Sequence, residues 1–234
     1  MKKGSIVAIG GGGFDDGEMM PVFERIVALS GKPNPKVIYL PTARHDDLEP
    51  VPMMEGIFKS FGASDLEAIT LSNTEFAPGE LREKLLSADM IFASGGNLKF
   101  LMDTWNATGA TEIMREAYEL GKVLCGVSSG AMCWFDEGWD DCGENGAFMF
   151  IDCVGILPYC NCPHFEDPYW FRFTETVKNR SYSGIACENG AAMIYSNGVY
   201  ESVHGVKGGK VWFLDKNNGY KLTDFTELDR SMLK

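Results

Sequence analysis

Ser128 is the residue of this sequence best placed to act as a nucleophile. The apolar run Val123–Val127 predicts a buried strand, and the apolar residues at 131–135 predict a helix directly after it. In a nucleophile elbow, Gly-x-Ser-x-Gly, a sharp strand-to-helix turn lifts the serine hydroxyl above the sheet. Gly126 and Gly130 flank Ser128 at this spacing. The segment predicts acyl-transfer chemistry at Ser128, although the same pattern also fits an ordinary strand-to-helix turn.

A serine nucleophile needs a base, and the sequence has only three histidines. His204 follows the Asn-Gly hairpin signal at 197–198, where a solvent-facing strand histidine is expected. His45 precedes the serine in a polar loop. His164 ends an apolar stretch just before a helical segment, a place from which a rigid scaffold can present a catalytic loop residue. We therefore expect His164 to be the base.

The third member of such a site should be a carboxylate that holds the imidazole by its other nitrogen. Glu188 ends the apolar run 184–188 and precedes an Asn-Gly turn, so it should lie at a strand end and not on a charged helix face. The pattern favours Glu188. The rival carboxylates follow closely behind the elbow and are Asp136, Asp140, Asp141 and Glu144.

The chemistry also needs hydrogen-bond donors for the oxyanion. A second short strand, at 89–94, runs into the turn Gly95-Gly96-Asn97 and then into a helix. The backbone amides of Gly96 and Ser129 could converge on one oxygen. The ordinary interpretation of this segment is a glycine-rich turn with Asn97 as the helix N-cap.

Four blocks of the sequence together resemble the dipeptidase E and cyanophycinase family of serine peptidases. They are residues 95–97, 126–131, 162–165 and 184–188. The likeness extends from residue 6 to about residue 200. It implies a triad of Ser128, His164 and Glu188, with oxyanion contacts from Gly96 and a substrate-binding role for Asn97.

The resemblance also implies a substrate class. Members similar to dipeptidase E cleave aspartyl dipeptides, and relatives cleave the aspartyl-arginine units of cyanophycin. An acidic side chain is therefore expected at P1, the residue that supplies the scissile carbonyl. An arginine shortly after the histidine should meet that carboxylate, and Arg172 is the nearest match, with Lys178 and Arg180 as alternatives.

Length and composition fit a single domain over residues 1–234. The chain is 45% hydrophobic, and no Pro-rich or Ser-rich linker divides it. The net charge of −12 argues against nucleic acid and anionic membrane surfaces as partners, because both need basic groups. The run Ser5–Ile9 is too short for a signal peptide or membrane span, so we expect a cytoplasmic protein. The oligomeric state stays open, with a homodimer as one option.

Apolar runs alternate with helical stretches, which predicts an α/β fold with a mostly parallel sheet covered on both faces. The predicted strands are Ser5–Ile9, Lys36–Leu40, Leu66–Leu71, Met90–Ala93 and Val123–Val127. The predicted helices are Gly17–Ser30, Pro52–Phe61, Gly79–Ser87, Leu98–Trp105 and Thr111–Leu120.

The second half of the chain has a different pattern. It predicts an antiparallel extension of the same sheet, because hairpin turns are expected at 197–198 and 217–219. The family resemblance implies a flavodoxin-like arrangement, as in class I glutamine amidotransferases, with active residues at the carboxyl ends of strands. The predicted strands here are Phe148–Leu157, Ile185–Glu188, Ala191–Ser196, Val199–Val203 and Lys210–Leu214, with a helix near Tyr169–Lys178.

Cofactor and metal sites find less support. The glycine-rich loop 10–17 lacks the Gly-Lys-Ser/Thr of a phosphate loop, and its two aspartates would repel a pyrophosphate. Cys160, Cys162 and His164 would share one side of an extended strand, but a zinc site would want a fourth ligand and would take His164 from Ser128. We therefore expect no cofactor, no metal, and a small peptide as substrate.

Two alternatives to a serine peptidase stay open. An esterase of the α/β-hydrolase type has its carboxylate before the histidine, and Asp136 or Asp141 would then serve. A catalytically silent binding protein would keep the elbow only as a packing feature. The order of the triad members along the chain separates an esterase from a peptidase. Covalent labelling of Ser128 separates both enzymes from a silent binding protein.

Overall fold

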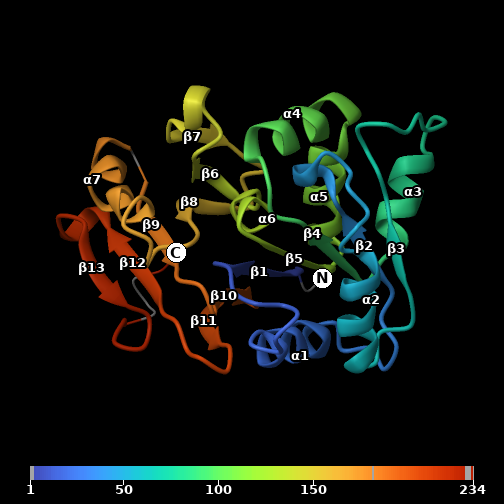
Figure 1. Cartoon of the computed structure of the whole chain (residues 1–234), viewed down its shortest axis with the longest axis horizontal. Coiled ribbons are helices and arrows are strands. Elements are labelled where there is room, and N and C mark those ends of the chain that lie inside the picture. Colours follow the sequence, from blue (N-terminus) through green and yellow to red (C-terminus); the bar gives the residue numbers. More distant parts are fainter. Residues whose placement is uncertain (1–2, 181, 230–232, 234) are drawn as a thin grey trace.

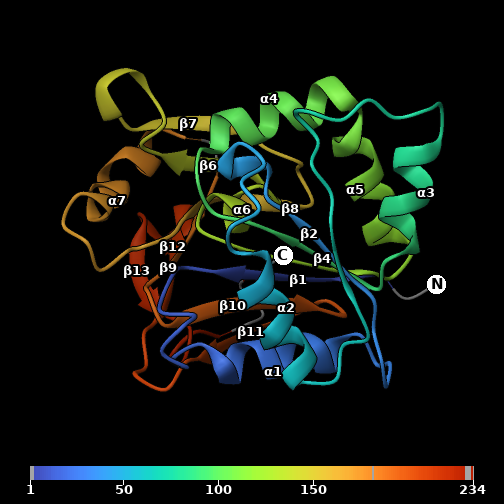
Figure 2. The same ribbon diagram turned by 45° about the vertical axis from the view of Figure 1, so that its right-hand side comes forward.

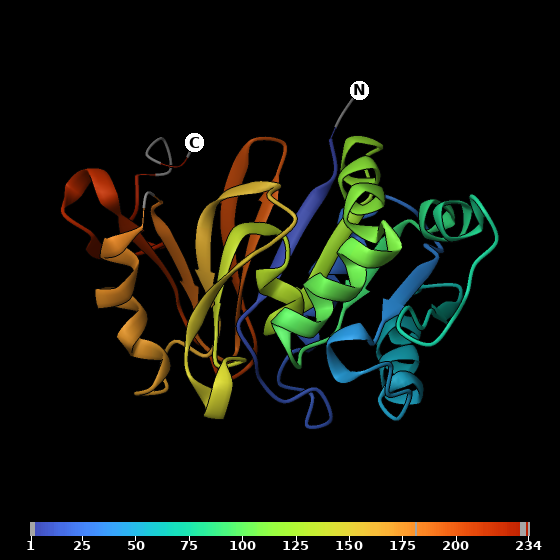
Figure 3. The ribbon, with the colours of Figure 1, turned by 90° about the horizontal axis from the view of Figure 1, so that it is seen from above.

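The protein is built around two β-sheets that lie side by side (Figures 1 and 3). The structure is a computed structural model, and it describes residues 3–180, 182–229 and 233. Within these ranges no helix combines the length and apolarity that crossing a membrane requires.

The first sheet has the strand order β11-β10-β1-β5-β4-β2-β3. Strands β1 to β5 pair in parallel, whereas β10 runs antiparallel to β1. The predicted antiparallel extension of this sheet is thus confirmed for β10 and β11. The strands are β1 (Ser5–Ile9), β2 (Val37–Leu40), β3 (Leu66–Ala68), β4 (Met90–Ala93), β5 (Val123–Val127), β10 (Ala191–Ser196) and β11 (Val199–His204).

Helices cover both faces of the first sheet, as the alternation of elements predicts (Figure 2). One face packs against α1 (Met20–Leu29) and α2 (Val51–Ser60), around Phe23, Phe58 and Phe92. The opposite face packs against the remaining helices of this half. They are α3 (Glu80–Ser87), α4 (Leu98–Thr108), α5 (Ala110–Glu119) and the short α6 (Ser129–Met132).

A second sheet, with the strand order β13-β12-β9-β8-β6-β7, is a feature that the sequence did not predict. Its inner face shares a core with the α3–α6 side of the first sheet, and its outer face packs against α7 (Phe173–Thr176). The strands are β6 (Phe135–Asp140), β7 (Met149–Asp152), β8 (Leu157–Cys162), β9 (Gly184–Cys187), β12 (Val211–Asp215) and β13 (Lys221–Asp224).

The prediction of one continuous sheet is therefore wrong for this part of the chain. The apolar residues after the elbow form only a four-residue helix before β6 begins at Phe135. The single strand predicted at Phe148–Leu157 forms β7 over Met149–Asp152 and then a loop, and β8 begins only at Leu157. Short 3-10 helices complete the fold, namely η1 (Thr42–Arg44), η2 (Glu144–Gly146), η3 (Trp170–Arg172), η4 (Val177–Asn179) and η5 (Lys216–Asn218).

Candidate active site

Ser128 lies on a strained turn between β5 and α6. Its backbone has φ 55° and ψ −120°, a conformation that L-residues rarely adopt outside functional turns. The turn is crowded: a Cβ atom at Gly126 would lie 2.2 Å from the carbonyl oxygen of Gly130, and one at Gly130 would lie 2.1 Å from that of Ala93. Only glycine fits at either place. The Ser128 amide donates to the carbonyl of Ile9 at 3.0 Å, which ties the elbow to the end of β1.

His164 faces Ser128 from the loop after β8. Its Nε2 lies 3.0 Å from Ser128 Oγ, a hydrogen-bond distance. The His164 backbone has φ 50°, and its amide donates to the carbonyl of Gly10 at 3.3 Å. The ring of Trp170 packs beside the imidazole, with 5.4 Å between ring centroids. The structure thus brings together the two residues that the sequence predicts as nucleophile and base.

The second imidazole nitrogen contacts Asn189, a residue that the sequence analysis missed. His164 Nδ1 lies 2.7 Å from Asn189 Oδ1. If Nδ1 carries the proton and donates to this amide oxygen, Nε2 is left as an acceptor for the serine hydroxyl. The backbone amide of Asn189 donates to Glu166 Oε2 at 2.8 Å, so a carboxylate two residues after the histidine holds the asparagine backbone.

The loop after β1 packs tightly against this pair. A Cβ atom at Gly11 would lie 1.9 Å from Asn189 Oδ1 and 2.7 Å from the ring of His164, and Gly11 has φ +156°. The Gly11 carbonyl also accepts the amide of Gly190 at 3.0 Å. The glycine-rich loop therefore acts as a spacer that lets the histidine and the asparagine meet.

The structure shows the Glu188 carboxylate bonded to groups other than His164, whose Nδ1 it was predicted to hold. Its Oε1 accepts from Trp212 Nε1 at 2.8 Å, and its Oε2 accepts from the Lys210 amide at 2.9 Å. Both partners belong to the β12 end of the second sheet. Glu188 thus joins β9 to β12, while the next residue along the chain reaches the imidazole.

The turn Gly95-Gly96-Asn97 lies against the elbow. A Cβ atom at Gly95 would lie 3.1 Å from Ser128 Cβ, and Ser129 Oγ donates to the Gly96 carbonyl at 2.8 Å. Asn97 caps α4, since its Oδ1 accepts from the Phe100 amide at 2.8 Å, which is the ordinary role weighed for it. In the described part of the chain, no group accepts a hydrogen bond from the amides of Gly96 or Ser129.

Asp140, a rival carboxylate, lies behind this turn and not beside the histidine. It is 2% exposed, and its Oδ2 accepts the Leu98 amide at 3.0 Å, at the start of α4. Burial raises the pKa of this carboxyl to about 6. Asp136 is half-buried, and burial raises the pKa of its carboxyl as well. Asp141 is exposed, as is Glu144 within η2.

The predicted cations for an acidic substrate lie outside the pocket next to Ser128. Arg172 and Lys178 are exposed on η3 and η4, and Arg180 forms an ion pair with Glu137. Arg44, which follows β2, lines that pocket instead. Its position at the carboxyl end of a parallel strand is the signal that could have identified it.

The remaining candidates of the sequence have other surroundings. His45 is exposed, and its ring lies 4.0 Å from that of Phe100. His204, in β11, has Nε2 at 3.4 Å from Ser202 Oγ. Burial raises the pKa of the thiols of Cys160 and Cys162, so both stay protonated at neutral pH.

Comparison with known proteins places this chain in a family. The family model described as Peptidase family S51 matches residues 6–203. The chain belongs to peptidase family S51. It is therefore a member of a serine peptidase family, the peptidase E and cyanophycinase family that the sequence blocks resemble.

Curated relatives cover much of the chain. The uncharacterized peptidase YgaJ of Bacillus subtilis is 29% identical over 212 residues, which is 88% of this chain and 90% of YgaJ. The uncharacterized peptidase Lmo0363 of Listeria monocytogenes is 25% identical over 171 residues, or 68% of this chain and 79% of the relative.

Two solved structures share the fold. A peptidase from an acI-B1 actinobacterium matches with a TM-score of 0.76 at 18% identity, over 95% of this chain and 94% of that one. A protein of Listeria monocytogenes EGD-e that is provisionally named peptidase E matches with a TM-score of 0.65 at 18% identity, over 86% and 98% of the two chains. This S51 chain thus has the α/β fold of these neighbours.

Proposed function

We propose that this chain is a serine peptidase that hydrolyses short peptides through an acyl-enzyme at Ser128. The observation that carries the proposal is the pair of contacts on one imidazole: Ser128 Oγ at 3.0 Å from Nε2, and Asn189 Oδ1 at 2.7 Å from Nδ1 of His164. A nucleophile, a base and a group that orients the base are the parts of a catalytic triad.

In the proposed reaction, Ser128 Oγ attacks the carbonyl carbon and its proton passes to His164 Nε2. The imidazolium then gives that proton to the leaving amine as the C–N bond breaks. Water attacks the resulting ester with His164 again as base, which releases the acid and restores the serine. The Gly96 and Ser129 amides are the proposed donors to the oxyanion, because both are close to the elbow and lack an acceptor among the described residues.

Asn189 takes the orienting role in this proposal, in place of the Glu188 carboxylate that we expected. An amide oxygen can fix the imidazole tautomer as a carboxylate does, and Cys-His-Asn sites use that arrangement. It stabilises the imidazolium less than a full negative charge would. The esterase order, with Asp136 or Asp141 in the triad, has no corresponding contact to His164.

A preference for an N-terminal aspartate is what the family resemblance implies for this site. It depends on a cation placed for the substrate carboxylate, and Arg172 is exposed and does not line the pocket beside Ser128. Asn97 also stays a candidate substrate contact only, because its side-chain oxygen is engaged by the Phe100 amide.

Hydrolysis of a dipeptide and tripeptide mixture, followed by mass spectrometry in the presence of a chelator, tests the proposed function. We expect wild-type protein to release free amino acids and Ser128→Ala to release none. Ser202 lies on β11, and the control variant Ser202→Ala should hydrolyse the peptides as wild type does. Equal hydrolysis by wild type and Ser128→Ala would contradict the proposal, and so would loss of hydrolysis with the chelator.

A further inference from the structure

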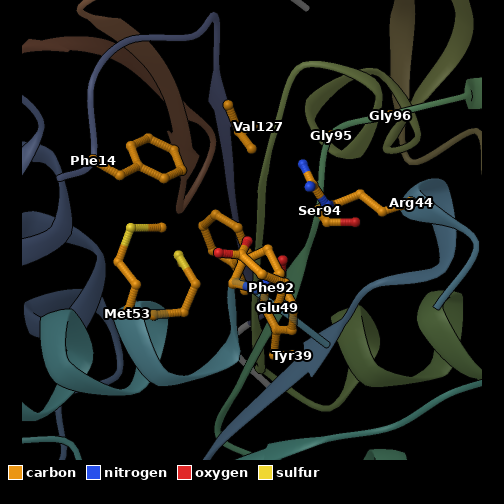
Figure 4. Close-up of a pocket in the computed structure, with 12 residues that line it drawn as sticks. Phe14, Tyr39, Arg44, Glu49, Met53, Phe92, Ser94, Gly95, Gly96 and Val127 are labelled. Atoms are coloured by element: carbon orange, nitrogen blue, oxygen red, sulfur yellow. The ribbon is translucent and has the colours of Figure 1, made fainter. Parts of the chain in front are cut away.

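A pocket opens on one side of Ser128, and the proposed reaction does not yet use it. Its volume is about 290 Å³, and its lining includes Val127, Gly95 and Gly96 (Figure 4). Ser128 is not one of the lining residues, but a Cβ atom at the lining residue Gly95 would lie 3.7 Å from Ser128 Oγ, so one wall of the pocket borders the hydroxyl. We call it the side pocket.

The order of strands places the side pocket opposite His164. In the first sheet β5, which carries the elbow, lies between β1 and β4. His164 contacts the loop after β1 through the Gly10 carbonyl, whereas the pocket borders Gly95 and Gly96 after β4. A leaving amine must lie near His164 to receive its proton, so the acyl part of a substrate extends the other way, toward the side pocket.

Half of the residues that line the side pocket have apolar side chains. They come from the loop after β1, from α2, from β4 and from β5, and include Phe14, Met53, Met54, Phe92 and Val127. Phe14 is held by an edge-on contact with the core residue Phe23, with ring centroids 5.3 Å apart. The two methionines are flexible, polarizable side chains that adapt to differently shaped apolar groups. These walls favour burial of an apolar side chain.

The charges around the side pocket disfavour an acidic side chain. Arg44 is the cation of its lining, and Arg44 Nη2 already lies 3.3 Å from Asp47 Oδ2. Glu49 also lines the pocket. In Figure 4, Arg44 lies on the side of the pocket opposite Phe14. Two carboxylates thus accompany one guanidinium, and a third carboxylate from a substrate would have to compete with them.

Two hydroxyl groups, of Tyr39 and Ser94, also belong to the lining. Ser94 is 2% exposed, and its Oγ has no hydrogen-bond partner among the described residues. A hydroxyl can pair with a neutral polar group or with a carboxylate, so these two groups do not choose between them. The two carboxylates beside the single guanidinium favour a neutral side chain over a carboxylate.

We propose that the side pocket is the S1 pocket and that it takes a bulky uncharged side chain, of the methionine, leucine or phenylalanine class. This inference depends on the proposed function, because it assumes that the acyl group is transferred to Ser128. It gives this chain a preference other than the aspartyl preference that the family resemblance implies. The volume suits one side chain, since it is near the lower end of the range of about 300 to 1,000 Å³ for small-molecule pockets.

A panel of dipeptides with one common leaving residue tests the inference. We expect kcat/KM for Met-Xaa, Leu-Xaa and Phe-Xaa to exceed that for Ala-Xaa by about 10- to 100-fold, as burial of a large apolar side chain predicts. We expect Asp-Xaa to be hydrolysed no faster than Ala-Xaa. Fastest hydrolysis of Asp-Xaa would overturn the S1 assignment while leaving the serine mechanism intact.

A matched pair of variants tests whether the side pocket is the place where the P1 side chain binds. Met53 in the pocket and Met149 on β7 are 38% and 39% exposed, so both tolerate a charged replacement equally well by this criterion. Met53→Arg should lower kcat/KM for Met-Xaa and Phe-Xaa by at least about 10-fold and raise the relative rate on Asp-Xaa. Met149→Arg should keep the wild-type profile.

Failure of the S1 assignment can be distinguished from failure of the proposed function. If Met53→Arg and Met149→Arg give the same profile on a Ser128-dependent activity, the S1 assignment is overturned and the peptidase function stands. If wild type hydrolyses none of the peptides, or Ser128→Ala hydrolyses them equally well, the proposed function fails and the S1 assignment with it. Circular dichroism of each variant shows whether the fold is intact.

Discussion

Replacement of Asn189 tests the feature of the site in which the structure departs from the sequence prediction. Its Oδ1 lies 2.7 Å from His164 Nδ1, and this bond strengthens when the imidazole takes up the serine proton. A hydrogen bond to a charged group contributes about 1.5 to 3 kcal/mol, which is about 10- to 150-fold in rate. Asn189 is exposed, so water can replace part of the bond. We therefore expect Asn189→Ala to lower kcat/KM by about 10- to 40-fold.

Glu188→Gln is the matched control, because it changes the adjacent residue and the one that the sequence favoured. Its carboxylate bonds the Lys210 amide and Trp212 Nε1, on the second sheet. We expect a loss of about 1 kcal/mol in the free energy of unfolding and kcat/KM within about threefold of wild type.

The pH profile separates an orienting role of Asn189 from a structural one. Asn189→Asp should keep activity and move the acidic limb of kcat/KM to higher pH, since a carboxylate on Nδ1 favours the protonated imidazole. The assay is initial-rate hydrolysis of one peptide across the pH range, with thermal unfolding as the check on folding. The reasoning is refuted if Glu188→Gln loses more activity than Asn189→Ala, or if Asn189→Asp leaves the acidic limb where it was.

Three further outcomes test the surroundings of the site. Burial raises the pKa of Asp140 from 3.8 to about 6, so the contribution of this carboxyl to stability is present below about pH 4 and is lost as the pH rises through about 6. The unfolding free energy of Asp140→Asn relative to wild type should therefore rise by about 2 kcal/mol between about pH 4 and pH 7, and a flat difference would argue against the burial cost. Gly11→Ala adds a Cβ atom 1.9 Å from Asn189 Oδ1, so kcat/KM should fall at least about 10-fold; unchanged kinetics would mean that the loop is not a spacer. Ser129→Ala removes a hydroxyl that bonds the Gly96 carbonyl but keeps the amide, so kcat/KM should stay within about 10-fold of wild type, and a loss as deep as that of Ser128→Ala would show that the hydroxyl is needed.

The elbow could be predicted from the sequence because its requirements are local. Gly126 and Gly130 are glycines for steric reasons that act within a few residues, and the strand before them is a continuous apolar run. His164 could be chosen because the chain has three histidines and this one lies at the end of an apolar stretch, just before a helical segment. The first sheet was predictable for a similar reason, since its strands and helices alternate regularly.

The second sheet could not be predicted in the same way. The residues at 131–135 are all apolar and show no periodicity, and a short run of this kind fits a buried helix or a buried strand equally well. The structure uses part of the run for a single helical turn and begins β6 at Phe135. The strand order of the sheet depends on contacts far apart in the chain, such as β12 with β9, which periodicity does not report.

The choice between Glu188 and Asn189 depends on the register at one strand end. β9 ends at Cys187, and Asn189 lies in the turn after it, so where the strand stops decides which side chain reaches His164. The pairing of β9 with β12 sends Glu188 toward Trp212. Residue type alone favoured the carboxylate, and tertiary contacts determine which of the two neighbours meets the imidazole.

Covalent labelling of Ser128 by a fluorophosphonate probe is the most direct test of the account, because such a probe reacts with a serine hydroxyl that a neighbouring base activates. We predict one adduct per chain, found by mass spectrometry on the peptide that contains Ser128. The adduct should be absent in Ser128→Ala, slow to form in His164→Ala and unchanged in Ser129→Ala. Labelling that persists in Ser128→Ala, or no labelling of a protein that hydrolyses peptides, would contradict the central claim that Ser128 is the nucleophile.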